Sequence, residues 1–273
     1  MIATLALLSV LQPSQDPACP CAFNLFAADP AFATMHPLKA PTGWTPLLGE
    51  MISFKDDDGR ATKAFWVKPG EEGKPCIVMV HEWWGLNDHI KETAEGLAEE
   101  TGYGVLAIDM YKGRLATTAE KAGEYMGSVS ESYGKSVVAG AVEALKDGSV
   151  YKASSIGTVG FCFGGGWSQK AAVAGGADVD ACVIYYGAPD ISDDALARLQ
   201  APVLMIWPTR DRWINKQLVD DFSAAMKKAG KSLRVEPYDA DHAFANPSNA
   251  RHNKKMADDA WAKTLAFYKE HLS

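Results

Sequence analysis

The string Gly-Phe-Cys-Phe-Gly at residues 160–164 most strongly constrains how this chain can fold. It follows an apolar run at 155–161 and opens onto a stretch of helical composition. A turn tight enough to join a buried strand to a helix leaves no room for side chains two residues before and after its centre, where Gly160 and Gly164 stand. Such a turn strains its central residue and lifts that side chain towards a substrate. The sequence therefore predicts a strand-to-helix elbow that carries Cys162 as an exposed nucleophile.

The predicted place of Cys162, at the N-terminus of a helix, suits a reactive thiol. A thiol attacks as the thiolate, and the partial positive charge of a helix N-terminus stabilises a thiolate. The alternative is a buried structural cysteine, since free cysteine is among the most buried residue types. Partners for Cys162 elsewhere in the chain decide between the two interpretations.

Length and charge narrow the class of protein. The chain has 273 residues, of which 47% are hydrophobic, and this suits one large domain, predicted at residues 47–273 after an N-terminal extension at 1–46. The net charge is −7, and the lysines and arginines form no cluster of the kind that binds phosphates. We therefore expect no nucleic-acid partner, and a monomer or a small homo-oligomer.

The N-terminal extension differs in character from the rest. Residues 2–11 are apolar, too few to span a bilayer, which needs about 20, but similar to the core of a signal peptide. No lysine or arginine precedes them, and residues 12–46 have no period, so an irregular segment is predicted there. A cytoplasmic and an exported location both remain open. Cys76 and Cys182 lie in apolar runs and are predicted to be core residues.

From about residue 50 the chain alternates between strand and helix patterns. Strands are predicted at residues 51–54, 64–67, 76–80, 105–108, 155–161, 181–186, 202–207 and 233–238. Helices are predicted at residues 88–100, 117–146, 166–174, 193–199, 218–229 and 254–271, the long one starting at a capping box on Thr117 and broken or kinked at Gly127 and Gly134. This alternation predicts an α/β fold with a mostly parallel, doubly wound sheet and helices on both faces.

Reactive groups in such a sheet gather at the carboxyl ends of its strands. Polar residues follow five predicted strands there: Glu82, Asp109, Cys162, Asp211 and His242. Cys162, Asp211 and His242 stand in the order nucleophile, acid, histidine, which is the chain order of the α/β-hydrolase fold. Asp109 is interpreted as a hydrogen-bond acceptor that fixes its own loop.

Each group of this predicted triad has a role in acyl transfer. Cys162 attacks an acyl carbonyl, His242 keeps the thiol ionised and later activates water, and Asp211 fixes the imidazole tautomer. The developing oxyanion needs preorganised donors. For this fold they are expected from the backbone N–H of Phe163, just after the nucleophile, and of Trp83, in the loop after the strand at 76–80.

At this point the sequence resembles the dienelactone hydrolase family, from about residue 50 to its end. The motifs that carry the resemblance are, in order, His81-Glu-Trp-Trp-Gly-Leu-Asn87, Asp109-Met-Tyr111, Gly160-Phe-Cys-Phe-Gly-Gly165, Tyr185-Tyr-Gly187, Asp211 and Asp241-His-Ala-Phe-Ala245. The resemblance implies a Cys-His-Asp triad of Cys162, His242 and Asp211, and it implies that Glu82 helps to activate the thiol when substrate binds. A loop glutamate could instead only cap the helix that follows it.

The sequence departs from the family where substrate binds. Members that act on dienelactone hold its carboxylate with two arginines, and the matching places here hold Gly113, with Arg114 one residue away, and Asn246. Neither glycine nor asparagine can make the two-pronged guanidinium contact. Tyr111, Trp213 and Phe244 are predicted to line an aromatic pocket beside Arg114 and Asn246, which favours a small neutral ester or lactone. Trp167 and Trp207 are expected to pack in the core.

Other functions remain to be weighed. His81, Glu82 and His89 lack the His-Glu-x-x-His spacing of a zinc site, and neither a metal nor another cofactor is predicted. The same fold could serve as a non-catalytic binding module, and an accessible low-pKa thiol could act as a redox sensor. A binding module has no need of the whole triad, and a sensor usually has a resolving cysteine nearby. Thioester or carbamate cleavage is not separable from ester cleavage by sequence.

Overall fold

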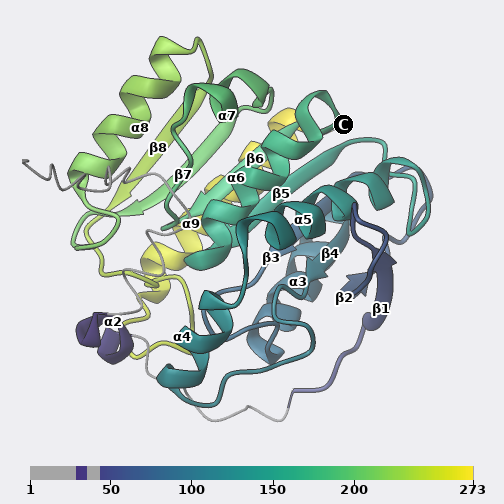
Figure 1. The fold of residues 1–273 in the computed structure, drawn as a ribbon, viewed down its shortest axis with the longest axis horizontal. Coiled ribbons are helices and arrows are strands. Elements are labelled where there is room, and N and C mark those ends of the chain that lie inside the picture. The colour runs from purple at the N-terminus through teal and green to yellow at the C-terminus, as the bar shows by residue number, and fades with distance from the viewer. Residues whose placement is uncertain (1–28, 36–43, 273) are drawn as a thin grey trace, which may run out of the picture.

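The fold is built on one eight-stranded sheet, in the order β1-β2-β4-β3-β5-β6-β7-β8, in a computed structural model that describes residues 29–35 and 44–272 (Figure 1). The strands are β1 (Gly49–Lys55), β2 (Ala61–Val67), β3 (Cys76–Val80), β4 (Gly104–Ile108), β5 (Ile156–Phe161), β6 (Ala181–Tyr185), β7 (Val203–Pro208) and β8 (Leu233–Tyr238). β1 pairs antiparallel with β2, and β2 with β4, while the other pairs are parallel. The predicted mostly parallel sheet is confirmed.

The central strands are short apolar runs buried from end to end. Every residue of β3, β4, β5 and β6 is buried, as parallel strands must be when helices cover both faces. Within the sheet β5 lies between β3 and β6, so the turn after it emerges near the middle of the molecule.

The helices are α2 (Pro30–Met35), α3 (Asp88–Thr101), α4 (Ala119–Gly127), α5 (Glu131–Lys146), α6 (Phe163–Gly175), α7 (Asp193–Arg198), α8 (Lys216–Lys228) and α9 (Lys254–His271). α6 packs on β5 and β6 with α5 beside it, and Figure 1 shows α9 behind the strands that α6 covers from the front. Trp261 of α9 donates to Glu100 of α3 at 2.9 Å, so these two helices meet. Helices therefore cover both faces, as expected.

The long helical region is broken after Gly127, one of the two glycines where a break or kink is predicted. Residues 117–146 therefore form two helices, α4 and α5. Ser130 is the N-cap of α5, and its hydroxyl oxygen accepts a hydrogen bond from the Tyr133 N–H. Thr118 rather than Thr117 caps α4. Gly134 does not kink its helix: a Cβ there would lie 2.0 Å from the ring of Trp167, so the glycine lets that ring pack closely.

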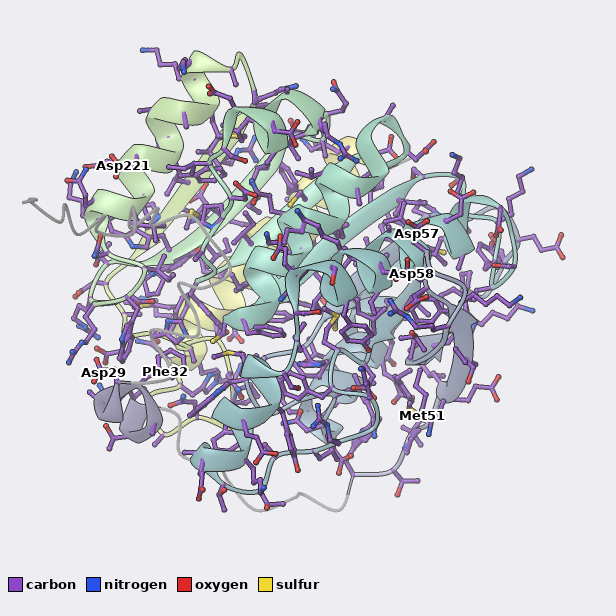
Figure 2. The ribbon with its side chains drawn as sticks, in the orientation of Figure 1. Asp29, Phe32, Met51, Asp57, Asp58 and Asp221 are labelled. Carbon is purple, nitrogen blue, oxygen red and sulfur yellow. The ribbon has the colours of Figure 1, made fainter. Side chains whose placement is uncertain are left out.

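The N-terminal segment predicted to be irregular contains a short helix, α2. The Asp29 carboxylate accepts from the Ala31 N–H at 2.9 Å, and Pro30 occupies the first helical position, where its missing N–H costs nothing. Figure 2 shows Phe32 on the side of α2 that faces the rest of the molecule. The predictions for residues 2–11 lie outside the described residues.

Strand β8 is an edge of the sheet among the described residues, since it pairs with β7 alone. It is half-buried and polar in part: Arg234 pairs with Glu270 at 3.3 Å and Glu236 with Lys263 at 2.8 Å. Pro237 stands near its end. No helix in the described part of the chain is long and apolar enough to cross a membrane.

Candidate active site

The turn between β5 and α6 has the geometry expected of a nucleophile elbow. Cys162 sits between the two elements with φ 56° and ψ −117°, a conformation that side-chain-bearing residues rarely adopt. A Cβ on Gly160 would lie 1.9 Å from the carbonyl oxygen of Gly164, and one on Gly164 would lie 2.3 Å from that of Val80. Only glycine fits at either position, so backbone packing holds the strain on Cys162.

The prediction of an exposed thiol was wrong. Cys162 is fully buried, and burial raises the pKa of its thiol. The charge and hydrogen bond of His242 and the backbone N–H of Phe163 oppose that rise. The sequence pattern predicts the turn, but the chain segments that pack over it come from distant loops, and no local pattern reports them.

His242 and Asp211 form a buried, hydrogen-bonded pair. The Nδ1 of His242 donates to Oδ2 of Asp211 at 2.5 Å, and Oδ1 of Asp211 accepts from the backbone N–H groups of Trp213 at 2.9 Å and Ile214 at 3.1 Å. Burial alone would lower the pKa of His242, but the charges of Asp211 and Cys162 and hydrogen bonds to both raise it well above its usual value. The structure thus brings Cys162, His242 and Asp211 together with the imidazole orientation fixed.

Glu82 is buried at the end of β3 and faces two polar side chains. Its Oε1 accepts from the Tyr186 hydroxyl at 3.1 Å and its Oε2 from the Asn246 amide at 2.5 Å. Burial raises the pKa of Glu82, and its charge in turn raises that of Cys162. Asn87, not Glu82, caps α3.

Tyr186 was missed as a site residue by sequence reasoning. In the sequence, Tyr186 stands out only as part of the motif at residues 185–187. In the structure it contacts Glu82, and its φ of 40° makes it a second strained residue at the end of a strand. Its place directly after a buried strand was a usable signal. Asp109 fixes its own loop as interpreted, accepting from the N–H groups of Tyr111 at 2.8 Å and of Gly113.

His81 holds backbone groups of the site in place and is not a metal ligand. Its Nδ1–H donates to the carbonyl oxygen of Glu82 at 2.7 Å, its Nε2 accepts from the Met110 N–H at 3.1 Å, and its ring stacks on Phe163. Burial lowers its pKa, so the ring is neutral. Among residues 29–35 and 44–272, no three His, Cys, Asp or Glu side chains converge on a point that could hold a metal ion.

The two predicted oxyanion donors belong to the start of α6 and to the loop after β3. The Phe163 N–H is the first of α6, and its hydrogen bond lowers the pKa of the Cys162 thiol. The Trp83 carbonyl accepts from the Tyr111 hydroxyl at 3.1 Å, which fixes the backbone of this loop. The role of the Trp83 N–H stays a prediction.

The three aromatic side chains predicted to line the pocket each pack against other rings. Trp213 lies edge-on to His242 with ring centroids 5.9 Å apart, and Tyr111 lies 5.7 Å from the ring of Phe163. Phe244 is fully buried between Tyr238 and Tyr186, at 5.1 and 6.1 Å.

Arg114 is turned towards α4. Its Nε donates to the Tyr111 carbonyl at 2.9 Å, its Nη2 to the Ser128 hydroxyl at 2.7 Å, and its guanidinium lies over the Tyr125 ring. Of the two tryptophans expected in the core, Trp167 is buried, and the half-buried Trp207 donates to the Ile214 carbonyl at 2.7 Å.

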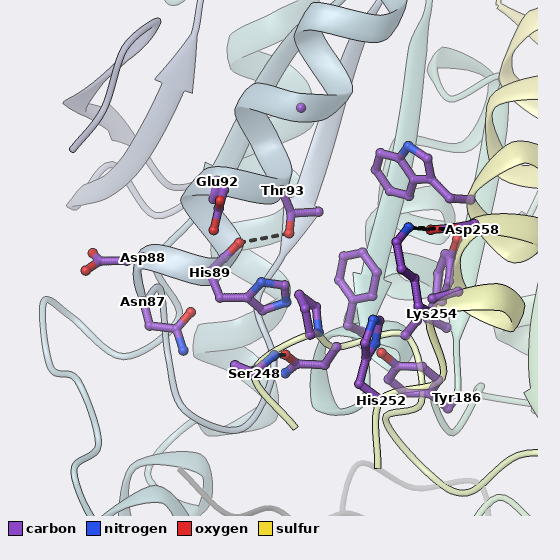
Figure 3. Close-up of a pocket in the computed structure, with 18 of the residues that line it drawn as sticks. Asn87, Asp88, His89, Glu92, Thr93, Tyr186, Ser248, His252, Lys254 and Asp258 are labelled. Carbon is purple, nitrogen blue, oxygen red and sulfur yellow. Dashed lines mark hydrogen bonds and ion pairs between the residues drawn. The ribbon is translucent and has the colours of Figure 1, made fainter. Parts of the chain in front are cut away.

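A cleft of about 1010 Å³ opens beside the triad, between the start of α3 and α9 (Figure 3). Tyr186 and Asn246, the two hydrogen-bond partners of Glu82, line it, whereas Cys162 and His242 do not. His89 lies in its wall, and burial followed by the charge of His252 lowers the pKa of His89 to about 4. The cleft therefore adjoins the Glu82 side of the site rather than the thiol.

Comparison with known proteins agrees with this geometry. The model of the dienelactone hydrolase family matches residues 62–272. Protein usf of Aquifex pyrophilus is 31% identical over 83% of this chain and 100% of its own length, and an Aquifex aeolicus protein that carries a carboxymethylenebutenolidase name is 29% identical over 82% and 100%. A solved dienelactone hydrolase-like promiscuous phosphotriesterase from metagenomic libraries covers 83% of this chain and 100% of its own, with a TM-score of 0.70 at 20% identity.

Proposed function

Because this chain belongs to the dienelactone hydrolase family, we propose that it hydrolyses carboxylic esters or lactones through an acyl-enzyme on Cys162. The observation that carries the proposal is the strained elbow that presents Cys162 to the buried His242–Asp211 pair. A non-catalytic binding module would gain nothing from this arrangement, because each of its buried polar groups costs free energy unless it is satisfied.

The proposed reaction has two steps. His242 takes the thiol proton, the sulfur bonds to the acyl carbon, and the carbon–oxygen bond breaks as His242 returns the proton to the leaving oxygen. Water then attacks the thioester while His242 accepts its proton, and the acid leaves as Cys162 is restored. The Phe163 N–H, with the Trp83 N–H as the predicted second donor, stabilises the oxyanion in both steps.

Glu82 is proposed to act on the thiol through its charge. Its ionised form raises the pKa of Cys162, so the thiolate forms more readily once Glu82 is protonated. The raised pKa of Glu82 itself favours that protonated form. Tyr186 and Asn246 hold it in place between turnovers.

The substrates we propose are small and neutral. Asn246 stands where dienelactone-cleaving relatives are expected to carry an arginine, and its amide is engaged with Glu82. Arg114 is engaged with Ser128 and Tyr125. Neither is placed to hold a substrate carboxylate with two hydrogen bonds, so an anionic group gives no advantage.

A redox sensor is the less favoured proposal. Cys76, Cys162 and Cys182 are all buried, and a sensor thiol is usually accessible and close to a resolving partner.

Intact-protein mass spectrometry during turnover of p-nitrophenyl acetate tests the function. We expect an acetyl adduct on the wild type and on a Cys182→Ala control, and neither adduct nor turnover with Cys162→Ala. An adduct that survives in Cys162→Ala would remove this residue from the mechanism.

A further inference from the structure

A phenylalanine from outside the family-matched region packs directly on the triad histidine. Phe32 of α2 is fully buried, with its ring centroid 5.0 Å from Trp83, 4.9 Å from Trp213 and 5.8 Å from His242. The match to the family begins at residue 62, so Phe32 lies outside the matched region.

The position of α2 is fixed by the loop that carries the triad acid. Asp29 Oδ2 accepts from Nη2 of Arg212 at 2.7 Å, and Arg212 directly follows Asp211. The other oxygen of Asp29 accepts from the Ala31 N–H at the start of α2. The ion pair is half-exposed and lies outside the core of the sheet, so it holds Phe32 in place with a modest free energy.

Trp213 indicates that an oxygen-bearing ligand belongs beside Phe32. Its indole N–H is buried and meets no hydrogen-bond acceptor among the residues that the structure describes. A buried donor left unsatisfied is unfavourable, and the Phe32 ring, packed edge-on against this indole, offers no oxygen to accept. The carbonyl or ether oxygen of an ester could supply the missing acceptor.

We infer that Phe32 is a specificity-determining residue, a wall of the ester pocket that limits the size of the acyl group reaching Cys162. The inference rests on the proposed hydrolase function. His242 contacts Phe32 through its ring and hydrogen-bonds Cys162, so a bulky group on a thiol-bound acyl chain must compete with Phe32 for space. Small acyl groups need no such space.

The first experiment compares kcat/KM for p-nitrophenyl acetate and p-nitrophenyl benzoate in the full-length wild type, Phe32→Ala and Phe32→Trp. We expect the benzoate-to-acetate ratio to rise about tenfold or more in Phe32→Ala and to fall in Phe32→Trp. A Phe32→Ala ratio equal to that of the wild type overturns the inference. A general loosening of the fold would change the benzoate-to-acetate ratio in the same direction in both variants, and that result overturns the inference as well.

The anchor of α2 gives a matched pair of variants. Asp29→Asn removes the charge that pairs with Arg212 but keeps an oxygen for the Ala31 N–H, so the benzoate-to-acetate ratio should rise by a few-fold. Asp239→Asn removes a more exposed ion pair, that with Arg210 at 3.2 Å, and should leave the ratio unchanged. Equal ratios in both variants contradict a size limit set by α2.

A second readout does not depend on ester cleavage. The alkylation rates of Cys162 by iodoacetamide and by the larger N-benzyl iodoacetamide are measured by peptide mass spectrometry, with Cys162→Ala to identify signal from other cysteines. Phe32→Ala should raise the ratio of the larger to the smaller reagent. If the alkylation ratio rises while no variant cleaves an ester, the hydrolase proposal is wrong but the size limit set by Phe32 is supported. If esters are cleaved and neither the alkylation ratio nor the benzoate-to-acetate ratio changes, only the size limit is wrong.

Discussion

At the scale of single residues, the imidazole of His242 is held between a carboxylate that orients it and a thiol that it ionises. The Nδ1 position is fixed by a buried bond to Asp211, and Asp211 is fixed in turn by two backbone N–H groups. An asparagine at position 211 could keep those backbone bonds but would present its amide N–H to the ring and favour the wrong tautomer.

Asp211→Asn is therefore expected to lower kcat for p-nitrophenyl acetate by about 10⁴-fold without a comparable loss of stability. Steady-state kinetics and the thermal midpoint of the same preparation provide the measurement. A rate near that of the wild type would mean that another acid orients His242.

The ionisation of Cys162 gives a prediction with a definite sign. His242 lowers the pKa of the thiol through its charge and hydrogen bond, so His242→Asn should raise that pKa. The thiolate then forms at higher pH, and the pH midpoint of its ultraviolet absorbance, with Cys162→Ala as baseline, moves up. A midpoint that stays in place or falls would exclude an interacting pair.

At the scale of elements, the elbow depends on two glycines that no other residue can replace. Gly160→Ala forces a methyl group onto the Gly164 backbone, and neither strand nor helix can move away without breaking its own hydrogen bonds.

We expect Gly160→Ala to cost more than about 3 kcal/mol of unfolding free energy, measured by chemical denaturation. Gly123→Ala in α4 is the control: a Cβ there meets nothing within 4 Å, so it should be neutral or stabilise by about 0.4–1 kcal/mol. Similar effects of both substitutions would argue against the steric account of the elbow.

The sequence predicted those elements whose cause is local. The alternation of buried runs predicted every described strand to within three residues, and the glycine spacing predicted the turn at Cys162. The break at Gly127 was predicted from that glycine, whereas the N-cap Ser130 that starts α5 was not predicted. The burial of Cys162 and the packing of Phe32 on His242 join segments far apart in the chain, and no short pattern encodes such contacts.

At the scale of the whole molecule, a single carboxylate holds the segment that leads into the first strand of the sheet. Oε1 of Glu95, buried in α3, accepts from the backbone N–H groups of Leu47 at 2.9 Å, Leu48 at 2.7 Å and Gly49 at 2.8 Å. This one side chain fixes the start of β1 on the far side of β2 from the triad, near the boundary predicted between the N-terminal extension and the domain.

Glu95→Ala should lower the unfolding free energy by about 2–4 kcal/mol, because three backbone N–H groups lose a charged acceptor. For a domain of this size the thermal midpoint should fall by roughly 5–10 °C. Glu99→Ala, at an exposed position of the same helix, should change it little. An equal effect of the two would mean that water replaces the lost acceptor.

The polar edge strand β8 bears on how this protein behaves when crowded or overexpressed. Its outer backbone groups could template pairing with a second chain, and an apolar edge of that kind seeds fibrils. Arg234 and Glu236, each fixed by an ion pair to α9, place charge along this edge, and Pro237 has no N–H to offer a new ladder. The sheet thus carries its own protection against edge-to-edge aggregation, independent of the chemistry at its centre.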